Sequence, residues 1–220
     1  MTHRDPVQEL VHIRGLMDRS TRFLSLSGLS GLFAGFVALV GVALADHHLR
    51  STLGSTMDAL TYGTGKGRAA TEGMMLTLIL DAILVLVVAL LGASWFTWRR
   101  SRHLGLHWWD ASAQRLLLSM LVPLSVGGVF CLALFYYDLP GLVPPTTLLF
   151  YGLALFSASR FTLDEVRWLG LSELVLGILG LFWLEAALLF WALGFGVLHI
   201  LYGGLMYLRY EHTDDRIERI

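Results

Sequence analysis

Ionisable side chains inside long apolar runs are the residues of this sequence that could do chemistry. Placing such a group in a bilayer costs about 2.5–3.5 kcal/mol on insertion scales, so it is a functional hint by default. Four candidates stand in or beside apolar runs: Asp81, Glu173, Glu185 and His199. Glu185 falls in a predicted turn that water can reach, and it is set aside. The other three could bind a polar ligand or exchange a proton.

Glu173 and His199 are predicted to lie in neighbouring spans, roughly 8 Å and 15 Å from the inner membrane surface by helical rise. Tyr202 follows His199 by three residues and lies on a similar helix face. The sequence therefore predicts a polar cluster of Glu173, His199 and Tyr202. This cluster could be a hydrogen-bond network that fixes helix packing, or a site for a proton or ligand. Asp81, in another span, is a separate candidate intramembrane site.

Motifs of known chemistries are missing from the sequence. It contains no H-E-x-x-H, no G-x-S-x-G and no cysteine pair, since Cys131 is the one cysteine. The glycine-rich stretch 63–67 lacks the spacing of a phosphate-binding loop. We therefore expect no catalytic residues, no metal and no cofactor. The net charge of −1 gives no general attraction to nucleic acid, and none is expected as a partner.

The elements that position these side chains are membrane-spanning helices. The chain is 55% hydrophobic and 15% charged, against roughly 25% charged residues in soluble domains. Backbone groups in lipid must pair within their own segment, so long apolar runs form helices. The sequence predicts an all-α membrane protein, a six-transmembrane-helix bundle, with spans at about 23–45, 74–98, 116–137, 142–159, 168–184 and 186–208.

Two boundaries in this prediction need an argument. The apolar run from 168 to 208 is too long for one span at about 1.5 Å per residue, so it is divided near Glu185 into a tight hairpin. Residues 46–72 are predicted to form the one long outer loop, with a short amphipathic helix followed by a flexible glycine-rich linker.

Lysine and arginine predict the orientation of the bundle. With the N-terminus inside, the inner segments hold thirteen of the sixteen Lys and Arg residues and the outer segments hold three. Positive residues collect on the cytoplasmic side of membrane proteins. We expect a bacterial inner-membrane protein with both termini in the cytoplasm. Its parts are then a cytoplasmic segment (1–22), a transmembrane domain (23–209) and a cytoplasmic tail (210–220).

Two features near the N-terminus indicate contacts with lipid and with other helices. Residues 5–21 have the apolar periodicity of an amphipathic helix that lies on the inner membrane face. Ser27, Gly31 and Gly35 fall four residues apart, which gives the first span a nearly flat face. Flat faces let helices approach closely in lipid. This face is expected to pack within the chain; homo-oligomerisation through it is the alternative.

Two segments carry a resemblance to known proteins. They are Ile13-Arg14-Gly15-Leu16-Met17-Asp18-Arg19-Ser20 with the following Arg22–Gly31, and Gly194-Phe195-Gly196-Val197-Leu198-His199-Ile200-Leu201-Tyr202-Gly203. In these segments the chain resembles a family of uncharacterised multi-pass membrane proteins of Bacteroidetes-like bacteria. The resemblance extends over most of the chain except the outer loop. It implies an inner-membrane location and no particular activity.

The absence of catalytic motifs, the short soluble segments and the small-residue faces favour a non-enzymatic role. We expect a structural, accessory or regulatory component of the inner membrane, whose partners are the lipid bilayer and either a second copy or another membrane protein. The alternative is a small proton-linked transporter or channel-like protein that uses the Glu173, His199 and Tyr202 cluster.

Overall fold

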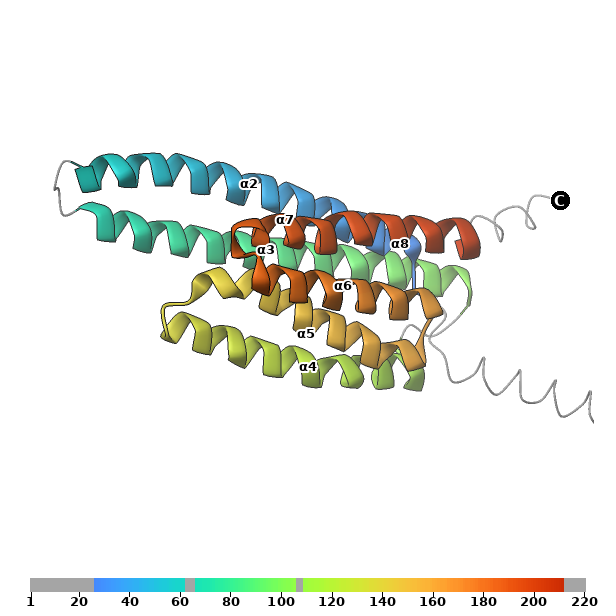
Figure 1. The fold of residues 1–220 in the computed structure, drawn as a ribbon. Coiled ribbons are helices and arrows are strands. Elements are labelled where there is room, and N and C mark those ends of the chain that lie inside the picture. Colours follow the sequence, from blue (N-terminus) through green and yellow to red (C-terminus); the bar gives the residue numbers. More distant parts are fainter. Residues whose placement is uncertain (1–25, 62–65, 106–108, 212–220) are drawn as a thin grey trace, which may run out of the picture.

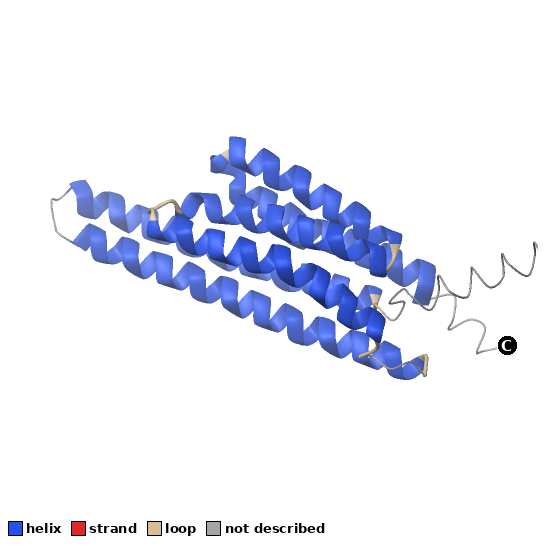
Figure 2. Ribbon diagram, turned by 90° about the horizontal axis from the view of Figure 1, so that it is seen from below, coloured by secondary structure: helices blue, strands red, loops and turns tan. Residues whose placement is uncertain are grey.

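The computed structural model of the chain describes residues 26–61, 66–105 and 109–211, and no strand occurs among them. Its helices are bundled side by side (Figures 1 and 2). The predicted interfacial helix at 5–21 and the tail after Glu211 lie outside the described residues. The main helices are α2 (Gly28–Thr61), α3 (Lys66–His103), α4 (Ala111–Tyr136), α5 (Val143–Ala158) and α6 (Asp164–Phe182).

The last helical stretch has four consecutive parts. It comprises α7 (Ala187–Trp191), the π-helix η4 (Ala192–Leu198), α8 (His199–Met206) and the π-helix η5 (Tyr207–Glu211). A π-helix widens the turn by one residue, and such turns are frequent at functional sites. The hairpin predicted near Glu185 is present, because α6 ends at Phe182 and a 3-10 turn covers Leu184–Ala186.

Five segments are long and apolar enough to cross a membrane: Gly28–Ser51, Gly73–His103, Ala111–Tyr136, Pro140–Phe161 and Leu184–Glu211. They correspond to five of the six predicted spans. The helix outside this set is α6, whose 19 residues carry Asp164, Glu165, Arg167 and Glu173. The described part of the chain is therefore an all-helical bundle with five apolar helices of spanning length.

The segment 46–72, predicted as an outer loop that holds one short amphipathic helix, is helical throughout its described residues, 46–61 and 66–72. Helix α2 continues to Thr61, and α3 already begins at Lys66. At about 1.5 Å per residue, these helices of 34 and 38 residues are roughly 51 Å and 57 Å long. They project as a pair beyond the other helices (Figure 1). Hydropathy marks where lipid ends, and a helix need not end there.

Local sequence explains several helix ends. Asp110 is the N-cap of α4, and its carboxylate accepts a hydrogen bond from the amide of Ala113 at 2.7 Å. Pro144 and Pro145 stand in the first turn of α5, where a missing amide hydrogen costs nothing. Pro123 lies inside α4, which nevertheless continues to Tyr136.

Small residues bring the central helices together. A Cβ atom on Gly31 of α2 would lie 3.0 Å from the Cα of Gly203 in α8. Gly152 of α5 and Gly170 of α6 meet in the same way, each within 3 Å of the other's carbonyl oxygen once a Cβ is added. The core therefore consists of α2, α5, α6 and the α7–α8 stretch. Helix α3 packs mainly on α2, and α4 mainly on α5.

Candidate functional site

Glu173 and His199 lie together in the interior, as the sequence predicts. Glu173 of α6 is 0% exposed, and His199 at the start of α8 is 7% exposed. His199 Nδ1 is 3.4 Å from Glu173 Oε1. This separation fits an ion pair by distance, yet neither carboxyl oxygen of Glu173 has a hydrogen-bond partner among the described residues. A fully buried carboxyl without a donor is costly and marks this position as unusual.

The histidine ring is held at both nitrogens. Nδ1 lies 3.0 Å from the carbonyl oxygen of Gly194, and Nε2 lies 2.9 Å from the hydroxyl of Tyr151 on α5. A carbonyl oxygen can only accept, so Nδ1 carries the ring proton and donates it to Gly194. In that tautomer Nε2 accepts the hydroxyl hydrogen of Tyr151. The cluster of Tyr151, Glu173, Gly194 and His199 is called the buried polar cluster below.

Gly194 belongs to the π-helix η4, and its missing side chain makes room for the acid. A Cβ atom there would overlap Oε2 of Glu173 and would lie 2.5 Å from Cδ2 of Leu148. Aromatic rings close the cluster on another side: Phe195 stacks on His199 at 5.9 Å between centroids and packs against Tyr151 at 5.0 Å. The irregular helix and the glycine together make a pocket fitted to one carboxyl group.

Tyr202, which the sequence places in this cluster, makes no hydrogen bond to Glu173 or His199 in the described part of the chain. It packs against the apolar cluster of Leu155, Val166 and Leu169, as Tyr151 also does. Tyr151 occupies the role expected for Tyr202. Tyr151 comes from α5, so it could not be predicted from the hairpin of the last two spans. A hydroxyl in the middle of an apolar span is the signal that could have found it.

Asp81 is not part of the buried polar cluster, because it lies on α3 and faces α2. A Cβ atom on Gly41 of α2 would lie 3.5 Å from Asp81 Oδ2. Asp81 also lines an open groove between α2 and α3, together with apolar side chains. The intramembrane candidates thus form two separate places in the fold.

The small-residue face of the first span packs inside the chain. Gly31 meets Gly203, and a Cβ atom on Gly35 would lie 2.6 Å from the carbonyl oxygen of Gly196. Ser27 is buried, and its hydroxyl donates to the carboxylate of Glu211 at 3.2 Å. This face of α2 is therefore covered by the last helical stretch of the same chain.

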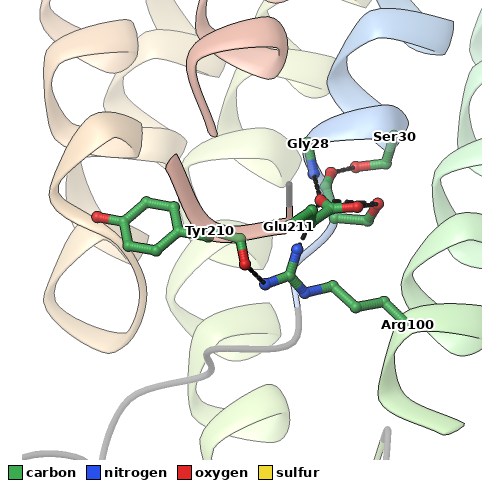
Figure 3. Close-up of polar contacts among 6 residues, drawn as sticks. Gly28, Ser30, Arg100, Tyr210 and Glu211 are labelled. Carbon is green, nitrogen blue, oxygen red and sulfur yellow. Dashed lines mark hydrogen bonds and ion pairs between the residues drawn. The ribbon is translucent and has the colours of Figure 1, made fainter. Parts of the chain in front are cut away.

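A second polar group joins helix ends at one side of the bundle (Figure 3). The Glu211 carboxylate accepts from the amide of Gly28 at the start of α2 and pairs with Arg100 of α3 at 2.6 Å. Arg100 also donates to the carbonyl oxygen of Tyr210 at 3.3 Å. A carboxylate at a helix N-terminus offsets the positive end of the helix dipole. The set of Ser27, Gly28, Arg100 and Glu211 is called the end clamp below.

The residue before Glu211 extends this connection to α6. The Tyr210 hydroxyl donates to Glu165 at 3.1 Å, and Arg209 pairs with the same carboxylate at 2.7 Å. The start of α2, the end of α3, the start of α6 and the end of η5 therefore meet on one side. These pairs join residues far apart in the chain, and the sequence predicts none of them.

Neither of two open grooves on the described surface is lined by Glu173 or His199. One lies between α2 and α3 beside Asp81. The other runs along α6 and η4, between Trp168 and Leu193, and is almost wholly apolar. The described His, Cys, Asp and Glu residues form no group of three that could hold a metal ion. Comparisons with protein-family models, curated proteins and solved structures found no match to the chain.

Proposed function

We propose that the chain is a six-span integral protein of the bacterial inner membrane that acts as a non-enzymatic structural, accessory or regulatory component. The observation that carries this proposal is the closed packing of the core. Glycines on α2, α5, α6 and α8 allow backbone-to-backbone contact, and Glu173 is fully buried in a space fitted to its own carboxyl group. This packing favours a rigid helical unit over a conduit.

The sixth crossing in this proposal is α6. After Arg167, its one charged residue is Glu173, which faces the protein interior and not lipid. Its 19 residues are roughly 28 Å long, close to the thickness of the hydrocarbon core. The end clamp and the Glu165 pairs gather alternate helix ends on one side, as an even number of crossings requires. The excess of arginine there supports a cytoplasmic location for that side.

Reporter fusions test this topology. Fusions after Arg102 and after Arg216 should report the cytoplasm, and fusions at Thr64 and Glu185 should report the outer side. The fusion at Glu185 is the decisive one, because α6 must cross for it to appear outside. A cytoplasmic signal at Glu185 together with an outer signal at Arg216 would replace six spans by five.

A small proton-linked transporter is the second candidate, and one observation favours it. The carboxyl of Glu173 is buried without a hydrogen-bond partner beside a histidine in a π-helical turn. Groups of this kind form proton relays in membrane transporters. The test is proton uptake by liposomes that contain the purified protein, under an imposed potassium diffusion potential. Flux that disappears in a well-folded Glu173→Gln variant would establish the transporter and remove the structural proposal.

A further inference from the structure

Asp81 is a carboxyl group at membrane depth that opens toward lipid. It lies eight residues inside the apolar segment Gly73–His103, roughly 12 Å along the helix from its start. The side chain is partly exposed, and no hydrogen bond of its carboxylate is found among the described residues. A carboxyl group in this position is expensive unless another group pairs with it.

Asp81 lines an open groove between α2 and α3. The groove has a volume of about 240 Å³. Phe36, Val40 and Leu44 of α2 line one wall, and Leu84 and Val88 of α3 line the other. Gly41 lies opposite Asp81, and because it has no side chain it leaves the groove deeper at this point. An apolar helix ridge with one polar side chain would match these walls.

Helix α3 has room for such a neighbour. It packs mainly on α2, and a row of its large apolar side chains is exposed, with Leu84 at 59% and Leu91 at 66%. Lipid tails can cover the leucines, but they offer no donor to a carboxylate. A transmembrane helix with a basic side chain supplies both the apolar cover and the opposite charge.

A second copy of this chain does not fit the groove equally well. None of its sixteen Lys and Arg residues lies within the six spans predicted from the sequence, and its intramembrane histidine, His199, is buried. Two copies packed through the same groove would bring two aspartates together without a basic side chain to pair with either. The charge at Asp81 therefore points to a different protein.

We propose that the groove beside Asp81 binds a transmembrane helix of another membrane protein, through a lysine or arginine of that helix that pairs with Asp81. This inference rests on the accessory role proposed above, and it names the chemistry of the partner. The apolar walls hold the helix, and Asp81 selects it and sets its depth.

Synthetic transmembrane peptides provide the test. The full-length protein is placed in phosphatidylcholine vesicles with Leu/Ala host peptides that carry Lys, Leu or Glu at the depth of Asp81. Energy transfer between labelled protein and labelled peptide measures binding. We expect the Lys peptide to bind at least tenfold tighter than the Leu peptide, and the Glu peptide to bind no tighter than the Leu peptide. Asp81→Asn, which keeps the shape, should remove most of this preference.

Two leucines on α3 give a matched pair that reports the position of the helix. Leu84→Trp fills the groove and should weaken binding of the Lys peptide, whereas Leu91→Trp, two turns away and outside the groove lining, should not. The melting temperature of each variant is measured to show that it is folded. Equal binding of Lys and Leu peptides, or equal effects of both tryptophans, would overturn the proposal.

Other outcomes separate this inference from the proposed function. Asp81-dependent energy transfer between two labelled copies of this chain, without peptide, would replace the heterologous partner by self-association. Failure of all peptides to bind removes the groove site and leaves the topology result intact. Proton flux that depends on Glu173 removes the accessory role itself, whatever the peptides do.

Discussion

The proton on His199 Nδ1 faces two acceptors at different distances. The Gly194 carbonyl oxygen is 3.0 Å away and takes the hydrogen bond, while Glu173 Oε1 is 3.4 Å away and receives none. The histidine is thus fixed by a backbone carbonyl and by Tyr151. The buried carboxyl group of Glu173 takes no part in these hydrogen bonds.

This arrangement predicts unequal costs for removing the two residues. Glu173→Gln keeps the side-chain shape and should lower unfolding stability by less than about 1 kcal/mol. His199→Ala leaves a void and strips Tyr151 and Gly194 of their partner, so we expect a loss of about 2–4 kcal/mol. Melting temperatures in one detergent measure both. Equal losses would mean that the ring does not hold the cluster together.

Two tyrosines test the membership of the cluster. Tyr151→Phe removes the hydroxyl that bonds to His199 Nε2 and should cost about 1–2 kcal/mol. Tyr202→Phe, in an apolar environment against Leu155, is the control and should change stability by less than about 0.5 kcal/mol. A larger loss of stability in Tyr202→Phe than in Tyr151→Phe would mean that Tyr202 belongs to the cluster, as the sequence predicts.

The fit between Gly194 and Glu173 can be measured by a double-mutant cycle. Gly194→Ala should destabilise the parent, because the new Cβ overlaps Oε2 of Glu173. In a Glu173→Ala background the carboxyl is gone, and the same change should cost less, with a coupling of at least about 1 kcal/mol. Additive losses would place the clash at Leu148 alone.

The closeness of α2 and α8 predicts a strong effect at Gly31. Gly31→Leu pushes a side chain into Gly203 and should lower the melting temperature markedly. Gly128→Leu in α4 is the matched control, because no atom lies within 4 Å of a Cβ atom added there. Its melting temperature should stay the same or rise. If both variants melt like the parent, α2 does not pack on α8.

The end clamp predicts that a single carboxylate near the C-terminus stabilises several helices. Glu211→Ala removes the acceptor for Ser27, Gly28 and Arg100, and should cost about 2–3 kcal/mol. Asp46→Ala removes an exposed pair with Arg50 and should cost less than about 0.5 kcal/mol. The comparison is made by thermal melting at low salt. If Glu211→Ala and Asp46→Ala lower the melting temperature equally, the end clamp does not stabilise the fold.

The sequence predicts the helices better than their ends. The spans and the turn near Glu185 follow from apolar length alone, and five of the predicted spans are helices of spanning length. The ends of α2 and α3 are missed because the apolar run of a helix can end before the helix does: α2 continues to Thr61, and its apolar segment ends at Ser51. The π-helix η4 leaves no periodicity that distinguishes it from an ordinary helix.

The residues of the candidate site could likewise be predicted only in part. Glu173 and His199 are predicted together because a tight hairpin joins their helices and fixes their relative depth. Tyr151 cannot be placed by that reasoning, because the contact of α5 with His199 depends on how Gly152 and Gly170 bring α5 and α6 together. The position of Asp81 in a groove likewise depends on the packing of α2 on α3.

The bond between Gly28 and Glu211 joins residues 183 positions apart. A chain made from its N-terminus produces α2 well before the residues that cap it and cover its glycine face. Until those residues are made, that face lacks its partner within the chain. The bundle therefore reaches its final packing only once translation has passed residue 211, and a ribosome stalled earlier holds an open assembly.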